Sequence, residues 1–383
     1  MEERLIIKDF GPIKEVNMTF GRFNVLIGEQ ATGKSAVLKV LAVCRYFSYL
    51  TGKVVESANP FSAGLLDWGI LNFRGQDSYI EYDCEDYTLY YEIVSETSSG
   101  GFTLKGPGLY GLRVTAKTRR FKELQEELQS LRKEGSIPYT FFKTSVAEVM
   151  RNPLFLSTER NSHFLGFTTS NNKAILENAG KLRQLRQRYY QEVEIEPLNL
   201  SYKNNGTEMV IKRTDEDAYH RLSESASGYQ SAVPIVLSIK AYTEPPEAEG
   251  LPLSKQKTFI IEEPELNLFP TAQYELMKFL VDKTMNYGNQ MFLATHSPYI
   301  LTALNDMILA AQAGVTDAEK TNSVIEEKYW LNSYEVRAYK LQNGTCQNIL
   351  DSETGLIHAE EIDEVSNRIN AIYDNLCEIK YAE

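Results

Sequence analysis

The most informative residues of the chain form a glycine-containing loop of a type that binds phosphate. Residues 28–35 read GEQATGKS and fit the pattern GxxxxGK[ST] at every fixed position. In this pattern, backbone N–H groups wrap around the phosphates, the lysine reaches the β- and γ-phosphates, and the final hydroxyl ligates Mg²⁺. We therefore expect ATP and Mg²⁺ as cofactors, with Lys34 in catalysis and Ser35 on the metal. The expected nucleotide-binding residues are Gly28, Glu29, Gln30, Ala31, Thr32, Gly33, Lys34 and Ser35.

Paired carboxylates end an apolar run much later in the chain. Residues 258–265 read TFIIEEPE, so two glutamates stand at the carboxyl end of a predicted strand. One carboxylate beside a phosphate loop can hold Mg²⁺, and a second can polarise the attacking water. We assign Glu262 to the metal and Glu263 to the general base. Without the phosphate loop, the same string would be interpreted as a solvated turn.

Two further segments have weaker but related patterns. Residues 291–298 read MFLATHSP, and His296 at this strand end is expected to contact the γ-phosphate; a purely structural histidine is the alternative. Residues 225–230 read SASGYQ and precede a helical run, so Ser227 and Gly228 could form an anion site at a helix N-terminus. The alternative is a simple helix cap.

The remaining candidates are single residues and basic clusters. Gln76 lies about 40 residues after Lys34 and before a strand, where a glutamine that contacts Mg²⁺ is plausible. Arg160 either contacts nucleotide or pairs with a buried acid. Two basic clusters are either solvated helix faces or contacts for nucleic acid or an acidic partner: Lys117, Arg119, Arg120 and Lys122, and then Lys181, Arg183, Arg186 and Arg188.

These residues need elements that bring them together. The apolar run at 23–27 predicts a buried strand that leads into the phosphate loop, and a helical pattern starts near Lys34. Residues 78–94 alternate as strands do, and 259–261 and 291–294 are further apolar strands. Helical seams follow at 121–131 and 182–189, and residues 355–383 have an amphipathic helical pattern. This alternation predicts an α/β fold.

Length and composition limit the remaining possibilities. The chain has 383 residues with 40 Lys+Arg against 52 Asp+Glu, a net charge of −12, which argues against a protein that coats nucleic acid generally. Its 4 cysteines are far apart, and no CxxC pair or histidine cluster suggests a metal site or disulfide framework. No stretch approaches the length of a membrane helix and no secretory signal is apparent, so we expect a cytoplasmic protein without membrane contact.

In their order, these motifs resemble the ABC-type ATPase heads of the SMC/RecF/OLD group, and the segments IKDFGPI (7–13) and FNVLIG (23–28) look similar too. The resemblance implies a P-loop NTPase fold with a mixed β-sheet lobe and an inserted helical arm. It also implies a homodimer or higher homo-oligomer in which Ser227 and Gly228 of one head complete the ATP site of the other. The predicted segments are residues 1–111 and 221–350 as the two ATPase lobes, 112–220 as the inserted arm, and 351–383 as a C-terminal helix. Because Lys34 and Glu263 must meet around one phosphate, the lobes form one unit.

The chain also departs from that pattern. Gln30 and Ala31 stand where Asn-Gly is usual, and the stretch LNLFP (266–270) resembles OLD-like ATPases with both histidines replaced. No Toprim nuclease motif follows His296. The resemblance therefore implies an ATPase that switches a separately encoded effector, a nuclease or toxin, in bacterial anti-phage defence. A DNA-binding repair or recombination ATPase of RecF type, or a scaffold that binds ATP without hydrolysing it, are the alternatives.

Overall fold

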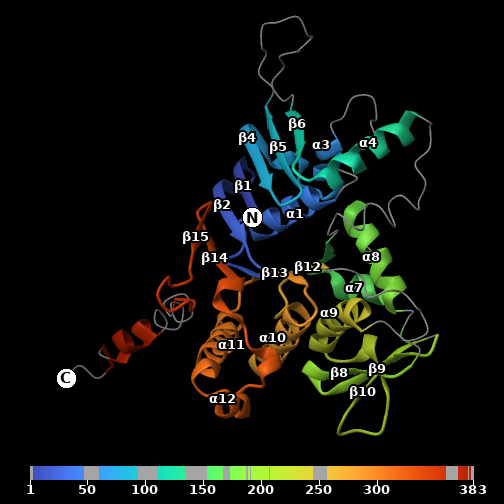
Figure 1. The fold of residues 1–383 in the computed structure, drawn as a ribbon. Coiled ribbons are helices and arrows are strands. Elements are labelled where there is room, and N and C mark those ends of the chain that lie inside the picture. Colours follow the sequence, from blue (N-terminus) through green and yellow to red (C-terminus); the bar gives the residue numbers. More distant parts are fainter. Residues whose placement is uncertain are drawn as a thin grey trace, which may run out of the picture.

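The computed structural model describes residues 3–46, 60–93, 110–133, 153–166, 173–186, 189, 191–206, 208–244, 257–358, 370–377 and 379–380. Its largest element is an eleven-stranded sheet in the order β6-β5-β4-β1-β2-β15-β14-β3-β13-β12-β7. A four-stranded sheet has the order β11-β10-β9-β8. Figure 1 shows the small sheet beside α9, at the opposite end of the molecule from β4, β5 and β6.

One half of the large sheet is antiparallel. Strand β1 pairs with both β2 and β4, and β5 and β6 follow on the far side of β4. The strands are β1 (Glu3–Phe10), β2 (Ile13–Phe20), β4 (Arg74–Asp83), β5 (Tyr87–Ile93) and β6 (Tyr110–Ala116). Helices α3 (Pro60–Asp67) and α4 (Arg119–Lys133) pack onto this half. Phe121 and Leu124 of α4 are buried in the same core, which confirms the helical seam predicted there.

The other half is parallel and carries the motifs. Its strands are β14 (Val336–Gln342), β3 (Phe23–Ile27), β13 (Gln290–Thr295), β12 (Thr258–Glu262) and β7 (Leu154–Leu156), all running the same way. Strand β15 (Thr345–Asn348) joins this half to β2. The α/β fold with a mixed sheet is thus confirmed.

These parallel strands are apolar throughout because both of their faces are covered. Ile260 and Phe292 belong to one core, with α1 (Lys34–Arg45). Ile261 and Leu293, their neighbours along the strands, belong to a second core. Side chains of α9 (Ser227–Thr243), α10 (Pro270–Met285) and α11 (Pro298–Thr316) are part of that second core.

The interval 112–220 is not purely helical. Strands β6 and β7 belong to the main sheet. Between β7 and α9 lie α7 (Arg160–Leu165), α8 (Lys173–Arg186) and the small sheet of β8 (Val193–Ile195), β9 (Leu200–Asn204), β10 (Met209–Arg213) and β11 (His220–Arg221). The helical interpretation is therefore corrected: short strands that pair only with each other carry a weaker pattern than the helices beside them.

Helix α12 (Ala318–Val324) follows α11 and precedes β14. After β15, residues 350 and 357 form an isolated bridge, and residues 370–377 are helical. The helix expected over 355–383 therefore starts later, and residues 359–369 lie outside the described part. Within the described residues, no helix combines the length and apolar character needed to cross a bilayer. The four cysteines are free thiols.

A buried arginine fixes the far end of α1 to the sheet. Arg45 donates to Thr258 Oγ1 and Gln290 Oε1 at 2.8 Å each, and it also pairs with Glu3 and hydrogen-bonds to Tyr82. These partners lie at the amino ends of β12, β13 and β1 and on β4. The helix that begins at the phosphate loop is thus anchored to the strands that carry the acidic and histidine motifs.

Candidate functional site

The loop between β3 and α1 has the backbone that its glycines allow. Gly28 has φ 157°, and a Cβ there would lie 2.3 Å from the carbonyl oxygen of Leu341. Gly33 has φ 104° and caps α1. Ala31 has φ 61°, a left-handed conformation that costs an L-residue about 1–2 kcal/mol. The loop therefore adopts a compact turn against β14, although alanine replaces the usual glycine at position 31.

Lys34 is held inside this turn. Its Nζ donates to the carbonyl oxygens of Gly28 and Glu29, each at 2.8 Å, and lies 3.4 Å from His296 Nδ1. Desolvation lowers the pKa of Lys34 to about 8, although the carboxylates of Glu263, Glu265 and Glu262 act in the opposite direction. The ammonium is therefore poised to gain an anionic partner.

Glu262 is a buried carboxylate with one unused oxygen. Its side chain receives hydrogen bonds from the Ser35 hydroxyl and the backbone of Thr158, while Oε1 is buried without a partner. Desolvation raises the pKa of Glu262, while Ser35 and Lys39 oppose that rise. A buried carboxylate oxygen without a donor favours a bound cation. Ser35 and Glu262, predicted as metal ligands, are brought together.

Glu263 and His296 face each other across the ends of β12 and β13. Glu263 Oε1 lies 3.6 Å from His296 Nε2, and Glu263 has φ 46°. The next glutamate, Glu265, accepts hydrogen bonds from Thr295 Oγ1 at 2.9 Å and from the His296 amide at 2.7 Å. Lys34, Glu263 and His296, the three expected catalytic residues, thus form one contiguous group. Glu265 was missed as a site residue, although it stands in the same TFIIEEPE string.

Arg160 joins three segments of the site. It is fully buried, and its guanidinium donates to the carbonyl oxygens of Glu262 at 2.7 Å, Glu263 at 2.8 Å, Ser231 at 3.0 Å and Ser157 at 3.1 Å. Desolvation lowers its pKa to about 10, so the side chain stays charged at neutral pH. These acceptors are backbone carbonyls and not the side chain of a buried acid, whereas contact of Arg160 with nucleotide stays a prediction.

Ser227 and Gly228 begin α9, as predicted; Ser227 is exposed, and Gly228 packs against the loop after β12. A Cβ on Gly228 would lie 2.7 Å from the carbonyl oxygen of Asn267 and 3.2 Å from Leu268. Asn267 Nδ2 also approaches Ser231 Oγ at 3.3 Å. The nearest neighbours of Gly228 therefore belong to the end of β12 and the loop after it, here called the acidic loop (residues 262–268). They do not belong to the phosphate loop of the same chain.

Gln76 lies exposed near the start of β4. Its neighbour Asp77 donates its amide to Asp9 beside the turn between β1 and β2, and that turn packs on Gly33 of the phosphate loop, so contact of Gln76 with Mg²⁺ stays a prediction. On the side away from β13, the neighbour of β12 is β7, whose end places Thr158 beside Glu262. Parallel neighbours end at the same edge of a sheet, so the position after β7 faces the metal candidates.

The first basic cluster is partly neutralised by its neighbours. Lys117 pairs with Asp83, and Arg119 pairs with Glu123 at 2.7 Å. In the second cluster, Lys181 lies over the ring of Tyr46, 5.3 Å from its centroid. The side chains of Arg186 and Arg188 lie outside the described residues.

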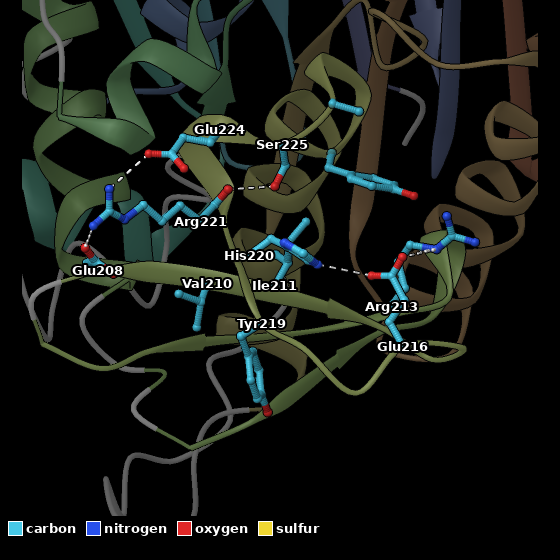
Figure 2. Close-up of a pocket in the computed structure, with 12 residues that line it drawn as sticks. Glu208, Val210, Ile211, Arg213, Glu216, Tyr219, His220, Arg221, Glu224 and Ser225 are labelled. Carbon is cyan, nitrogen blue, oxygen red and sulfur yellow. Dashed lines mark hydrogen bonds and ion pairs between the residues drawn. The ribbon is translucent and has the colours of Figure 1, made fainter.

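A hollow of about 520 Å³ lies next to the start of α9, between β10, β11 and residues 224–229 (Figure 2). Its cations already have carboxylate partners: Arg221 pairs with Glu208 and Glu224, and His220 Nε2 lies 3.4 Å from Glu216. Arg213 pairs with Asp215 at 2.7 Å. These paired charges give the hollow no excess of positive charge with which to bind phosphate.

Among the comparisons with known proteins, the family model agrees with an ATPase. A family model described as an AAA ATPase domain matches residues 114–301, just under half of the chain. The structure of an SMC head domain from Thermotoga maritima aligns with 12% identity and a TM-score of 0.43, covering 91% of this chain and 98% of that one. An Smc head with an extended coiled coil, bound to a ScpA domain derived from Pyrococcus furiosus, aligns with 10% identity, a TM-score of 0.47, and 96% and 99% coverage.

A RecF recombination mediator structure aligns with 10% identity and a TM-score of 0.37, covering 91% of this chain and 98% of that one. The comparison with curated proteins gives no match. The predicted resemblance to an ATPase is confirmed by the family model, which spans β7, α9, β12 and β13. The features expected of OLD-like proteins in particular stay predictions.

Proposed function

We propose that this chain is a Mg²⁺-dependent ATPase whose heads close in pairs around ATP. One observation carries the proposal: Lys34 and Ser35, at the start of α1, face Glu262, Glu263 and His296 at the ends of β12 and β13. Phosphate cradle, metal ligands, base and γ-phosphate sensor are the parts that phosphoryl transfer to water requires. The match to an AAA ATPase domain supports the same reading.

In this proposal each residue of the site has a separate role. Backbone amides of residues 28–35 and the Lys34 ammonium hold the phosphates, and Glu263 accepts the proton of the attacking water. His296 lies between Lys34 and Glu263, where it can hydrogen-bond the γ-phosphate. Mg²⁺, held by Ser35 and Glu262, would supply positive charge to the transferred phosphoryl group. The buried Oε1 of Glu262 fits this role because it has no protein donor.

The dimer follows from the location of Ser227 and Gly228. They start a helix in which Ser227 is exposed, and their own chain packs Gly228 against the acidic loop and not against its phosphate loop. A second copy, turned so that its phosphate loop meets this helix start, would use both residues on its ATP. The trigger of closure and the effector that it switches, a nuclease or toxin in anti-phage defence, rest on the sequence resemblance alone.

Phosphate release by the purified protein tests the chemistry. We expect Mg²⁺-dependent release from ATP by the unaltered protein. Glu263→Gln should retain ATP binding and lose turnover by about 10²-fold or more, because only the base is removed. Lys34→Ala should lose binding as well. Normal turnover by Glu263→Gln would exclude Glu263 as the base.

The dimer is tested separately, by size in solution. Glu263→Gln should form a dimer when ATP and Mg²⁺ are added, and Ser227→Arg in the same background should stay monomeric with ATP bound. Dimers of both variants would show that the start of α9 is not the contact. Failure of Glu263→Gln to dimerise with ATP bound would remove paired closure from the proposal.

A further inference from the structure

The strongest unexplained feature is the fully buried cation of Arg160. Burying a guanidinium costs several kcal/mol unless its donors are satisfied. Here two donors go to the backbone of the acidic loop, at Glu262 and Glu263, and one goes to Ser231 in the first turns of α9. No carboxylate is among these hydrogen-bond acceptors. The guanidinium group of Arg160 therefore connects the acidic loop to the start of α9.

Those two segments have different tasks in the proposed dimer. The acidic loop serves the nucleotide of its own head, whereas the start of α9 serves the nucleotide of the second copy. Arg160 links them through hydrogen bonds to their backbone carbonyl oxygens. Asn267 makes a parallel link, through Ser231 Oγ and the close approach to Gly228.

Both linked segments also contain a local irregularity of the backbone. Glu263 has φ 46° and Asn267 has φ 61°, so the acidic loop needs outside contacts to hold its shape. Helix α9 contains Pro234, which removes the N–H that would bond the Gln230 carbonyl oxygen. The first turns of α9 are thereby less tightly joined to the rest of the helix and depend more on Arg160.

Resting on the proposed function, we infer that Arg160 is a positioning residue that couples the two ATP sites of the dimer. When the second copy's nucleotide engages Ser227 and Gly228, the start of α9 shifts, and Arg160 carries the shift to the Glu263 backbone. The base of each head is then correctly placed only when that head's own α9 is engaged. Hydrolysis at both sites is therefore linked.

The experiment mixes heads of two kinds at low concentration. A head under study is combined with excess partner that cannot hydrolyse ATP, either Glu263→Gln or Lys34→Ala. Both partners supply Ser227 and Gly228 to the studied head, but only Glu263→Gln brings a nucleotide that engages the studied head's α9. Size measurements establish that mixed dimers form, and phosphate release is counted per studied head.

Coupling predicts that unaltered heads turn over about tenfold faster with the Glu263→Gln partner than with Lys34→Ala. Heads with Arg160→Lys should turn over equally with both partners and about 10²-fold slower than unaltered heads, since a misplaced base is costly. Their affinity for ATP should stay within about twofold, since Lys34 is untouched. Lysine keeps the charge but cannot reach carbonyls in both segments.

A matched control separates positioning from stability. Arg45→Lys removes the guanidinium group of another buried arginine, which lies at the opposite ends of β12 and β13. It should lower the melting temperature yet retain the difference between the two partners. If Arg160→Lys does not fold, Asn267→Gly tests the second link, because glycine keeps the backbone conformation and loses the contact to Ser231.

The outcomes are distinguishable. Equal rates of unaltered heads with both partners, in confirmed mixed dimers, would overturn the coupling while leaving the ATPase intact. A preserved tenfold difference in Arg160→Lys heads would overturn the role of Arg160. Absence of any hydrolysis by unaltered heads would instead refute the proposed function.

Discussion

The pKa of Lys34 makes a prediction about nucleotide binding and pH. Desolvation lowers that pKa from 10.5 to about 8, and the protonated form is the one that binds phosphate. Bound phosphates stabilise the ammonium, so binding takes up a proton once the free lysine has lost it. Affinity must then fall as pH rises through about 8.

The magnitude follows from the protonated fraction. With a pKa of about 8, roughly nine tenths of Lys34 is charged at pH 7 and one tenth at pH 9. The dissociation constant for ATP should therefore rise about tenfold over this interval, or about 1.4 kcal/mol. A lysine with its ordinary pKa of 10.5 would give a change of only a few per cent. ATP does not titrate here, because the last phosphate pKa is about 6.

A fluorescent, non-hydrolysable ATP analogue titrated into the unaltered protein at pH 7, 8 and 9 measures this without turnover and keeps Glu263, whose carboxylate raises the pKa of Lys34. Lys257 is the matched control, because desolvation, with Lys181 adding to it, lowers its pKa to about 8 as well, and it lies before β12, at the strand end remote from the motif. Lys257→Met should show the same tenfold fall, and Lys34→Ala should bind weakly without a pH trend. A flat profile in the parent, or an unchanged fall in Lys34→Ala, would refute the reasoning.

Three further predictions concern single residues. Gly28→Ala should lose ATP binding and about 2 kcal/mol of unfolding free energy in urea, because its Cβ would collide with the Leu341 carbonyl; full binding would contradict the loop geometry. Glu262 has a raised pKa in the fold, so it stabilises the protein below the ordinary value of 4.5 and that contribution is lost as pH rises. Glu262→Gln should therefore gain melting temperature relative to the parent from pH 5 to pH 8 without Mg²⁺ and lose Mg²⁺-dependent hydrolysis; a constant difference would argue against a buried carboxylate. Arg45→Lys should cost about 2 kcal/mol in urea unfolding, since bonds of a buried cation to Thr258 or Gln290 are lost; no loss would show that the anchor is not needed.

The sequence was sufficient for the motifs that one strand and one turn define. Residues 23–35 and 258–263 each contain an apolar strand followed directly by polar residues. A short stretch of sequence is therefore enough to predict the strand and to place the polar residues at its carboxyl end. Parallel strands then bring the ends together, which is why Lys34, Glu262, Glu263 and His296 were found without a structure.

Features decided by strand order were not predictable in this way. Thr158, which lies beside Glu262, was not found because it follows β7, whose three residues carry almost no pattern. The small sheet is similar, because β8 and β11 have three and two residues. The acceptors of Arg160 are backbone carbonyls, which leave no trace in residue types.

The acidic loop shows why the motif alone does not make the site. In an extended strand, Glu262 and Glu263 would point to opposite faces, and only one could reach the phosphate loop. The positive φ of Glu263 breaks that alternation, and the strain is held by two contacts from outside the motif: its amide donates to Ala294 at 2.7 Å, and Arg160 binds its carbonyl oxygen. Glu265 in turn fixes the backbone of His296. The position of the base therefore depends on β13 and Arg160 together, so changes in either should alter turnover before they alter ATP binding.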